Sequence, residues 1–204
     1  CKEYNGTSWT DAGGLATGAP VKGASGTQTA CLATNSAGTE IYNGTSWSSG
    51  TNLSSPRGFG VAASRNGTST FLIIAGGSTP PGAGSNLTEL YDGNAWSSQA
   101  TMTTARSGLG GAGTASATIV YGGEPGSGDT EVSEEWDFSI NTVTNAAWAS
   151  TPSLGTARRQ VGGFGHTTTT AVCVCGQNPP ALSNVEEYDG SSWSEVNNMP
   201  VARV

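Results

Sequence analysis

The stretch EYNGTSW at residues 3–9 returns three times along the chain, as EIYNGTSW at 40–47, ELYDGNAW at 89–96 and EEYDGSSW at 186–193. A phrase that recurs in this way indicates a protein built from repeated structural units. The tryptophans that end the phrases, together with Trp148, lie 38, 49, 52 and 45 residues apart. This period is close to the roughly 40–50 residues of one β-propeller blade.

A second residue type recurs at a fixed distance from these tryptophans. An arginine stands ten residues after each of the last four tryptophans, whereas ten residues after Trp9 the chain has Ala19, followed by Pro20. The first unit therefore departs from the pattern. The arginines are Arg57, Arg106, Arg158 and Arg203. The two markers together predict one domain over 1–204, with units at about 10–47, 48–96, 97–148 and 149–193.

Each unit also carries two apolar stretches that predict β-strands. The stretch after the arginine is rich in glycine, and the next is a short apolar run that ends in Gly-Gly, as in TFLIIAGG at 70–77 and SATIVYGG at 116–123. Runs of four to eight apolar residues bounded by glycine have the length of a strand. Because these runs are continuous rather than alternating, we expect both of their faces to be buried.

The repeated phrase itself predicts a β-hairpin. Asn-Gly or Asp-Gly between two β-rich halves favours a two-residue type I′ turn. With Asn5-Gly6 as that turn, Tyr4 faces Thr7 and Lys2 faces Trp9, so Tyr4 and Trp9 pack diagonally. The structural aromatic residues expected from this pattern, including the variant pair of the third unit, are Tyr4, Trp9, Tyr42, Trp47, Tyr91, Trp96, Trp136, Trp148, Tyr188 and Trp193.

With apolar strand, Gly-Gly, Tyr, Trp and MPVAR (199–203) in this order, the sequence resembles kelch repeats, a β-propeller family that includes the central domain of galactose oxidase. Its low-charge units are similar to repeats of phage virion proteins and secreted bacterial proteins. The resemblance implies an all-β propeller of four-stranded antiparallel blades. It also implies binding by loops at one end of the disc, with arginines near the repeat starts lining that end.

The number of blades follows from the two fragments outside the complete units. Residues 194–204 and 1–9 could together supply a first strand and an outer hairpin, so we expect five blades, one of them a composite of the two chain ends. The alternative is that the sequence is a window on a longer chain with more blades.

The composition excludes several classes of partner. Only 11% of the residues are charged, against about 25% in an average soluble domain. The net charge is −7, and the eight Lys and Arg residues form no run, which argues against nucleic-acid binding. No apolar stretch approaches the roughly 20 residues of a membrane span. We expect an extracellular protein or one on a virion surface.

Catalytic and cofactor sites are also not expected. His166 is the only histidine, which is too few for a copper or catalytic zinc site. No Gly-x-Ser-x-Gly turn frames a serine nucleophile. Glutamates begin the phrases at Glu40, Glu89 and Glu186, but one per blade is better placed to pair with an arginine than to form a glycosidase acid pair. The sequence predicts no enzyme, no metal and no cofactor.

Three further sets of residues have both a functional and a structural interpretation. The arginines Arg57, Arg106, Arg158 and Arg203 could form a ring that binds carboxylated sugars or acidic peptides, or each could tie a loop to its neighbour. The cysteines are Cys1, Cys31, Cys173 and Cys175, and a disulfide from Cys1 could hold the two ends of the ring together. Alternatively, all four are small apolar side chains that fill space in the core. Cys1 as a lipidated N-terminus is a third option. Sequons occur at Asn5, Asn43, Asn52, Asn66 and Asn86, of which three read Asn-Gly-Thr and serve the turn.

These observations favour a non-enzymatic recognition or adhesion module that binds a cell-surface glycan or protein through its variable loops. Those loops are 34–39, 78–88, 124–130 and 176–185. The alternatives are a structural building block of a fibre, sheath or capsid decoration, which would bind copies of itself, and, with low weight, a secreted carbohydrate-active enzyme.

Overall fold

The computed structural model describes residues 1–18, 21–36, 38–58, 61–64, 69–79, 82–137 and 147–203. For 61–64, 147 and 166 it describes the backbone alone.

Four antiparallel sheets of four strands each make up most of the described chain. The first contains β3 (Gly23–Thr27), β4 (Ala30–Thr34), β5 (Thr39–Tyr42) and β6 (Trp47–Ser49). The second contains β7 (Val61–Ser64), β8 (Leu72–Ala75), β11 (Thr88–Tyr91) and β12 (Trp96–Gln99). The third contains β13 (Gly110–Thr114), β14 (Ala117–Tyr121), β15 (Ser133–Asp137) and β16 (Ala147–Thr151). The fourth contains β17 (Gly162–Thr167), β18 (Thr170–Val174), β19 (Val185–Tyr188) and β20 (Trp193–Glu195).

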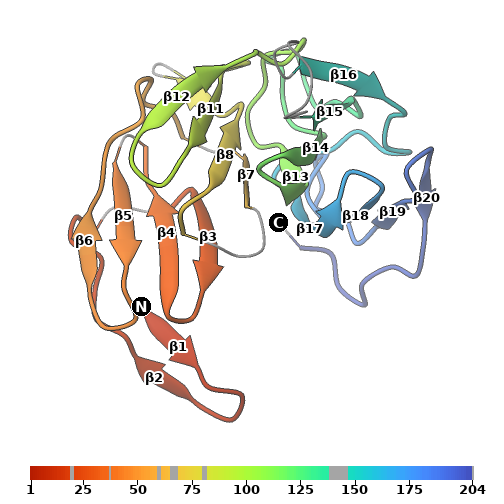
Figure 1. Cartoon of the computed structure of the whole chain (residues 1–204). Helices are drawn as coiled ribbons and strands as arrows, with labels where there is room; N and C mark the ends of the chain where they lie inside the picture. Colours follow the sequence, from red (N-terminus) through yellow and green to blue (C-terminus); the bar gives the residue numbers. More distant parts are fainter. Residues whose placement is uncertain are drawn as a thin grey trace.

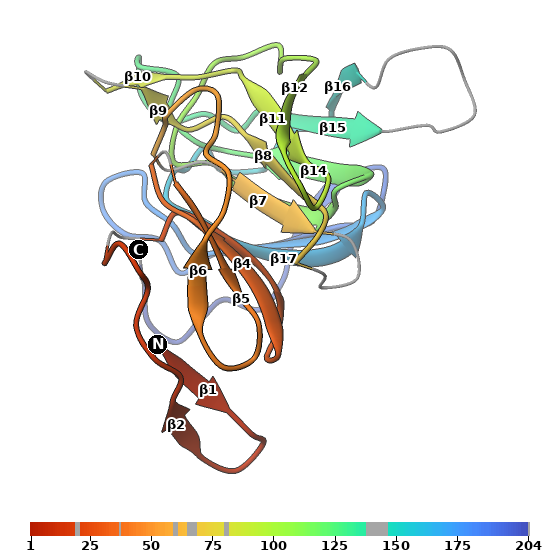
Figure 2. The same cartoon turned by 60° about the vertical axis from the view of Figure 1, so that its left-hand side comes forward.

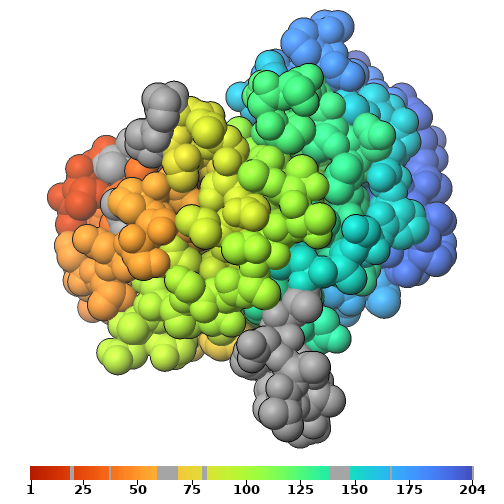
Figure 3. All heavy atoms as spheres, turned by 90° about the horizontal axis from the view of Figure 1, so that it is seen from above, coloured from red at the N-terminus to blue at the C-terminus, as the bar shows by residue number. Residues whose placement is uncertain are grey.

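The sheets are the blades of a β-propeller, as the repeat predicts. Their first strands lie next to one another in chain order: β3 packs beside β7, β7 beside β13 and β13 beside β17. Figure 1 shows the four blades following one another around a common axis. In the space-filling view the surface colours run in the same order from one side of the molecule to the other (Figure 3). Within the described residues, no contact of similar extent joins β17 to β3.

The expectation of five blades is wrong, because the two chain ends do not combine. Residues near the N-terminus form a separate two-stranded sheet, β1 (Lys2–Tyr4) with β2 (Trp9–Asp11), which extends beyond the first blade (Figure 2). At the other end, Arg203 bridges to Leu182 within the fourth unit. Residues 196–203 therefore form no strand of a further blade, and Arg203 belongs to the fourth unit.

The hairpin turns also differ from the prediction. Tyr4 lies directly opposite Trp9, so the loop has four residues instead of two. The side-chain oxygen of Asn5 accepts the N–H groups of Thr7 and Ser8, each at 2.9 Å, and Gly6 has a φ of +96°. An Asn or Asp side chain can cap a turn in this way, and this additional acceptor favours the longer loop.

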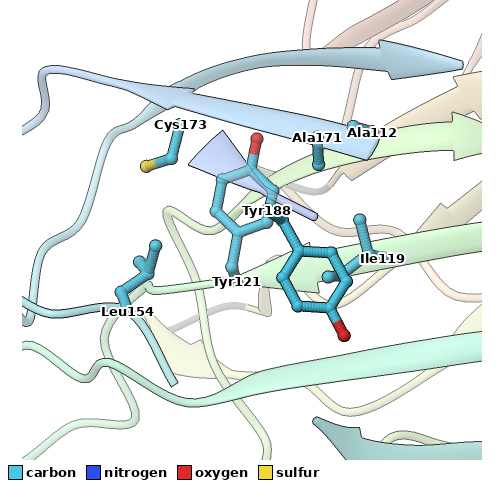
Figure 4. Close-up of a cluster of buried hydrophobic side chains, with 7 residues drawn as sticks. All are labelled: Ala112, Ile119, Tyr121, Leu154, Ala171, Cys173 and Tyr188. Atoms are coloured by element: carbon cyan, nitrogen blue, oxygen red, sulfur yellow. The ribbon is translucent and has the colours of Figure 1, made fainter. Parts of the chain in front are cut away.

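In the second, third and fourth blades the aromatic pair packs against the preceding blade. Ring centroids are 5.1 Å apart in Tyr42–Trp47 and 5.6 Å apart in the variant pair Trp136–Trp148. The pair of the first blade faces the N-terminal hairpin, whose Glu3 accepts the Tyr42 hydroxyl, whereas those of the other three blades face the preceding blade. Between the third and fourth blades, for example, Tyr188 belongs to a buried cluster with Ile119 and Tyr121 (Figure 4). Each blade thus covers one face of its neighbour, and none can bury both of its faces alone.

Candidate binding site

Buried ion pairs hold the loops at one end of the propeller. Arg57 lies 2.7 Å from Glu89, and Arg106 lies 3.0 Å from Glu134. Arg158 pairs with Glu186 in the same way. The three arginines are 2%, 0% and 0% exposed. Burial lowers the pKa of Arg57 and Arg106, while the paired glutamates act in the opposite direction; a guanidinium stays charged under such conditions.

Each of these glutamates also holds the loop that enters its blade. The carboxylate of Glu134 accepts the N–H of Thr103 at 2.7 Å, and that of Glu186 accepts the N–H of Gly155 at 2.6 Å. The arginine completes the connection by donating to carbonyls of a second loop, as Arg106 does to Gly122 at 3.0 Å. The ion pairs therefore fix two loops of each blade relative to one another.

The first blade keeps the carboxylate although its unit has no arginine at the matching position. Glu40 accepts the backbone N–H groups of Ala16 and Thr17 and the hydroxyl of Thr17. Desolvation alone would raise the pKa of Glu40, but these hydrogen bonds lower it below the usual value. The matching position, Ala19, lies outside the described residues.

The buried arginines thus lie where residues that connect the loops of a blade are expected. Arg57, Arg106 and Arg158 are enclosed within the blades and present no ring of guanidinium groups to solvent. Arg203 is the member of the series that lies at the surface. Sequence reasoning missed Glu134, because Trp136 stands where the other units have Tyr; the signal that could have revealed it is the glutamate two residues before the aromatic residue.

A pocket of about 230 Å³ opens at this end, between the first and second blades. Lys22 and Arg57 contribute positive charge to its lining, and Ser36, Ser78 and Thr79 contribute hydroxyl groups. Two of the variable loops identified in the sequence, 34–39 and 78–88, supply these hydroxyl groups. The second loop contains the short hairpin of β9 (Ser78–Thr79) and β10 (Ala83–Gly84).

The variable loop of the third unit carries a charged cluster. Arg159 lies 3.1 Å from Glu124 and 3.2 Å from Asp129. The side chain of Arg159 is partly exposed, in contrast to that of Arg158 beside it. The two carboxylates neutralise the charge of Arg159, which reduces its attraction for an external anionic group.

A second pocket, of about 290 Å³, lies between the N-terminal hairpin and the first blade. Cys1, Tyr4 and Trp9 line it from the hairpin, and Cys31 and Tyr42 line it from the blade. Unlike the first pocket, it contains none of the variable loops.

All four cysteines have free thiols, so the structure contains no disulfide that pins the ends of the chain. Cys1 is exposed, Cys31 is partly buried, and Cys173 and Cys175 are buried. Desolvation by burial raises the pKa of Cys173 to about 12. These features match the interpretation of the buried cysteines as apolar filler.

We expect Cys173 to resist alkylation in the native protein, because a thiol with so high a pKa is almost never a thiolate at pH 8. Iodoacetamide at pH 8, followed by peptide mass spectrometry, should label Cys1 at least about a hundredfold faster than Cys173. Unfolding in denaturant without reductant should remove the difference. Failure of Cys173 to react even after unfolding would contradict the free-thiol state.

The candidate glycosylation residues have several environments. Asn5 and Asn43 cap their turns through their side-chain oxygens. Asn86 donates to the carbonyl of Met102 at 3.3 Å, and Asn52 is exposed. Asn66 lies outside the described residues.

Among the side chains that the structure describes, no group of three or more His, Cys, Asp or Glu residues could hold a metal ion. No helix with the length and apolarity needed to cross a membrane occurs in the described part of the chain.

Comparison with known proteins supports the fold. No family model matches the chain, and no curated protein matches its sequence. Among solved structures, the chain is similar to one titled "Structure of YjhT", with a TM-score of 0.66 and 11% identity. The similarity covers 85% of this chain and 65% of the other, so the chain spans just under two thirds of that protein's length. At this identity the match establishes the β-propeller fold alone.

Proposed function

We propose that this propeller is a non-enzymatic recognition module of the kelch type, on a virion or outside the cell, that binds a carboxylate-bearing surface glycan or acidic protein. The main observation behind this proposal is the pocket between the first two blades, because it is lined by variable loops that a rigid scaffold holds in place. Lys22 supplies a cation, and the hydroxyl groups of Ser36, Ser78 and Thr79 supply the hydrogen bonds that a sugar needs.

The overall charge of the chain favours a site in which a cationic side chain lies close to an anionic ligand. The net charge of −7 repels anions in general, so an anionic ligand needs a cation at close range. Lys22 and Arg57 are the two cationic side chains that line the pocket, and Arg57 is buried against Glu89. A single small pocket binds weakly, and several copies on one particle would raise the apparent affinity.

A glycan array with sialylated, uronic-acid and neutral glycans tests the proposal, followed by titration of the best carboxylated sugar. We expect saturable binding of carboxylated glycans, weakened at least about tenfold by Lys22→Gln. Lys2→Gln, which removes an exposed lysine on the N-terminal hairpin, is the matched control and should bind as the wild type does. Equal binding of neutral and carboxylated glycans, or an unchanged affinity of Lys22→Gln, would contradict this site.

A structural building block is the second candidate, and the exposed apolar surfaces at the two ends of the blade series favour it. Tyr4 and Trp9 are 49% and 67% exposed at one end, and Phe164 is 62% exposed at the other. Such surfaces are typical of contacts between molecules. Polymers in electron micrographs, together with no saturable glycan binding, would favour this candidate over recognition.

A further inference from the structure

The fourth blade has one face that no other blade covers. By strand register, Val172 has the position in β18 that Leu32, Ile73 and Ile119 have in the second strands of the other blades. Those three side chains are 0%, 1% and 0% exposed, because the following blade covers them. Val172 is only partly buried.

Two larger apolar side chains belong to the same uncovered region. Phe164 lies opposite Val172 in the neighbouring strand β17 and is largely exposed. Met199 is 37% exposed and stands four residues before Arg203. The residues four before the other arginines are Leu53, Met102 and Leu154, and all three are buried between blades.

Arg203 has the backbone position of the buried arginines but lacks their partner. Its N–H donates to Leu182 at 3.1 Å and its carbonyl accepts from Gly176 at 3.2 Å. Arg106 makes the equivalent bonds to Ser85 and Gly77, both at 3.0 Å. The side chain of Arg203 is exposed and forms no ion pair with any residue that the structure describes.

The N-terminal hairpin cannot supply that partner. In all four blades a glutamate stands two residues before the aromatic residue of the third strand, and in three of them it forms the ion pair with the arginine. Two residues before Tyr4 the chain has Lys2. A hairpin docked in the same register would place an ammonium beside the guanidinium of Arg203, and such like-charge contacts are unfavourable.

We propose that this uncovered face docks one further blade of the same repeat type, which enters directly after Arg203 and carries Glu-x-Tyr in its third strand. The glutamate would pair with Arg203, as Glu134 pairs with Arg106. The tyrosine hydroxyl would donate to exposed Glu187, which has the position of Glu135, the acceptor of the Tyr188 hydroxyl at 3.2 Å.

The apolar contacts complete the fit. A docked blade would cover Val172, Phe164 and Met199, whose counterparts Ile119, Ala112 and Met102 are buried. Pro200 has no N–H at the position where Ser54, Thr103 and Gly155 donate to the glutamate. Recognition of the carboxylate therefore depends more on Arg203 than in the other units, which makes Arg203 the residue to test.

The test joins a copy of residues 160–195 directly after Val204, which supplies a blade with its own Glu186 and Tyr188. A matched fusion carries Glu186→Lys in the copy alone, imitating Lys2, and both fusions are also made with Arg203→Gln. Hydrogen exchange reports on β17 and β18 of the original fourth blade, and denaturant titration gives the unfolding equilibrium constant.

We expect the fusion with glutamate to slow exchange in β18 at least tenfold relative to the unfused chain. Its lysine counterpart should have an unfolding equilibrium constant at least tenfold larger than that of the glutamate fusion, and this difference should shrink in the Arg203→Gln background. Unchanged exchange in β18, or equal stability of the glutamate and lysine fusions, would overturn the proposal.

Two further measurements keep the proposal testable. If a fusion aggregates, a peptide of residues 182–196 added in trans should slow exchange in β18 in its glutamate form and not in its lysine form. Light scattering of the unfused chain should give a monomer at micromolar concentration. A dimer that both Trp9→Ser and Phe164→Ser dissociate would show instead that the hairpin of a second copy covers this face, and would overturn the proposal.

Discussion

Replacing Arg106 with methionine is expected to lower the free energy of unfolding by about 3–5 kcal/mol. Arg106 and Glu134 are both 0% exposed and lie 3.0 Å apart. Removal of the guanidinium leaves the carboxylate of Glu134 buried without its cation, and it leaves the carbonyl of Gly122 without that donor. Urea titration followed by tryptophan fluorescence measures the change.

Two controls separate burial from charge. Lys2→Met removes a cation from an exposed ion pair, because the side chains of Lys2 and Asp11 are 60% and 81% exposed, and a loss below about 1 kcal/mol is expected. The double variant Arg106→Met with Glu134→Leu should recover much of the loss, because it leaves no buried charge unpaired. A single variant as stable as the wild type would mean that this ion pair does not hold the loops in place.

The part of the fold that could be predicted from the sequence is the part repeated in every unit. Apolar runs such as the one ending at Gly76-Gly77 gave strand positions, since β8 spans Leu72–Ala75. The spacing of Trp136 and Trp148 predicted a paired third hairpin, and these residues lie opposite one another in β15 and β16. Each of these features depends on local preferences or on one neighbouring strand.

The features that sequence reasoning missed depend on single contacts outside the repeat. The turn at Asn5 has four residues because the side-chain oxygen accepts two N–H groups, an interaction that Asn-Gly alone does not specify. The composite fifth blade required residues 194–204 to form a strand, whereas Arg203 forms an isolated β-bridge with Leu182 of the fourth unit. Both errors came from assigning an average repeat geometry to segments that have different partners.

For the candidate site, the sequence located the arginines and the variable loops but not their surroundings. The pairing of Arg57 with Glu89 could be anticipated from one glutamate and one arginine per unit. The pocket beside Lys22 could not, because it depends on how loops from two different blades approach each other. Lys22 also lies outside the repeated markers, so no periodic signal pointed to it.

Trp136→Ala is expected to lower the free energy of unfolding by about 3–5 kcal/mol. Trp136 is 0% exposed and packs with Ile73 and Leu90 of the preceding blade. Its indole N–H also donates to the carbonyl of Ala115 at 3.3 Å. Truncation opens a cavity at the junction of two blades and removes this hydrogen bond, so packing within and between blades is lost together.

Trp9→Ala is the matched control, because Trp9 also belongs to an aromatic pair but is 67% exposed. We expect it to cost no more than about 1 kcal/mol, the worth of an exposed ring pair. Both variants should be measured by urea titration with circular dichroism, since each loses one tryptophan fluorophore. If the buried packing of Trp136 contributed little to stability, the two losses would be similar. A large loss confined to Trp136→Ala would show that the buried ring stabilises the junction of the two blades, in agreement with a repeat protein in which each blade depends on its neighbours.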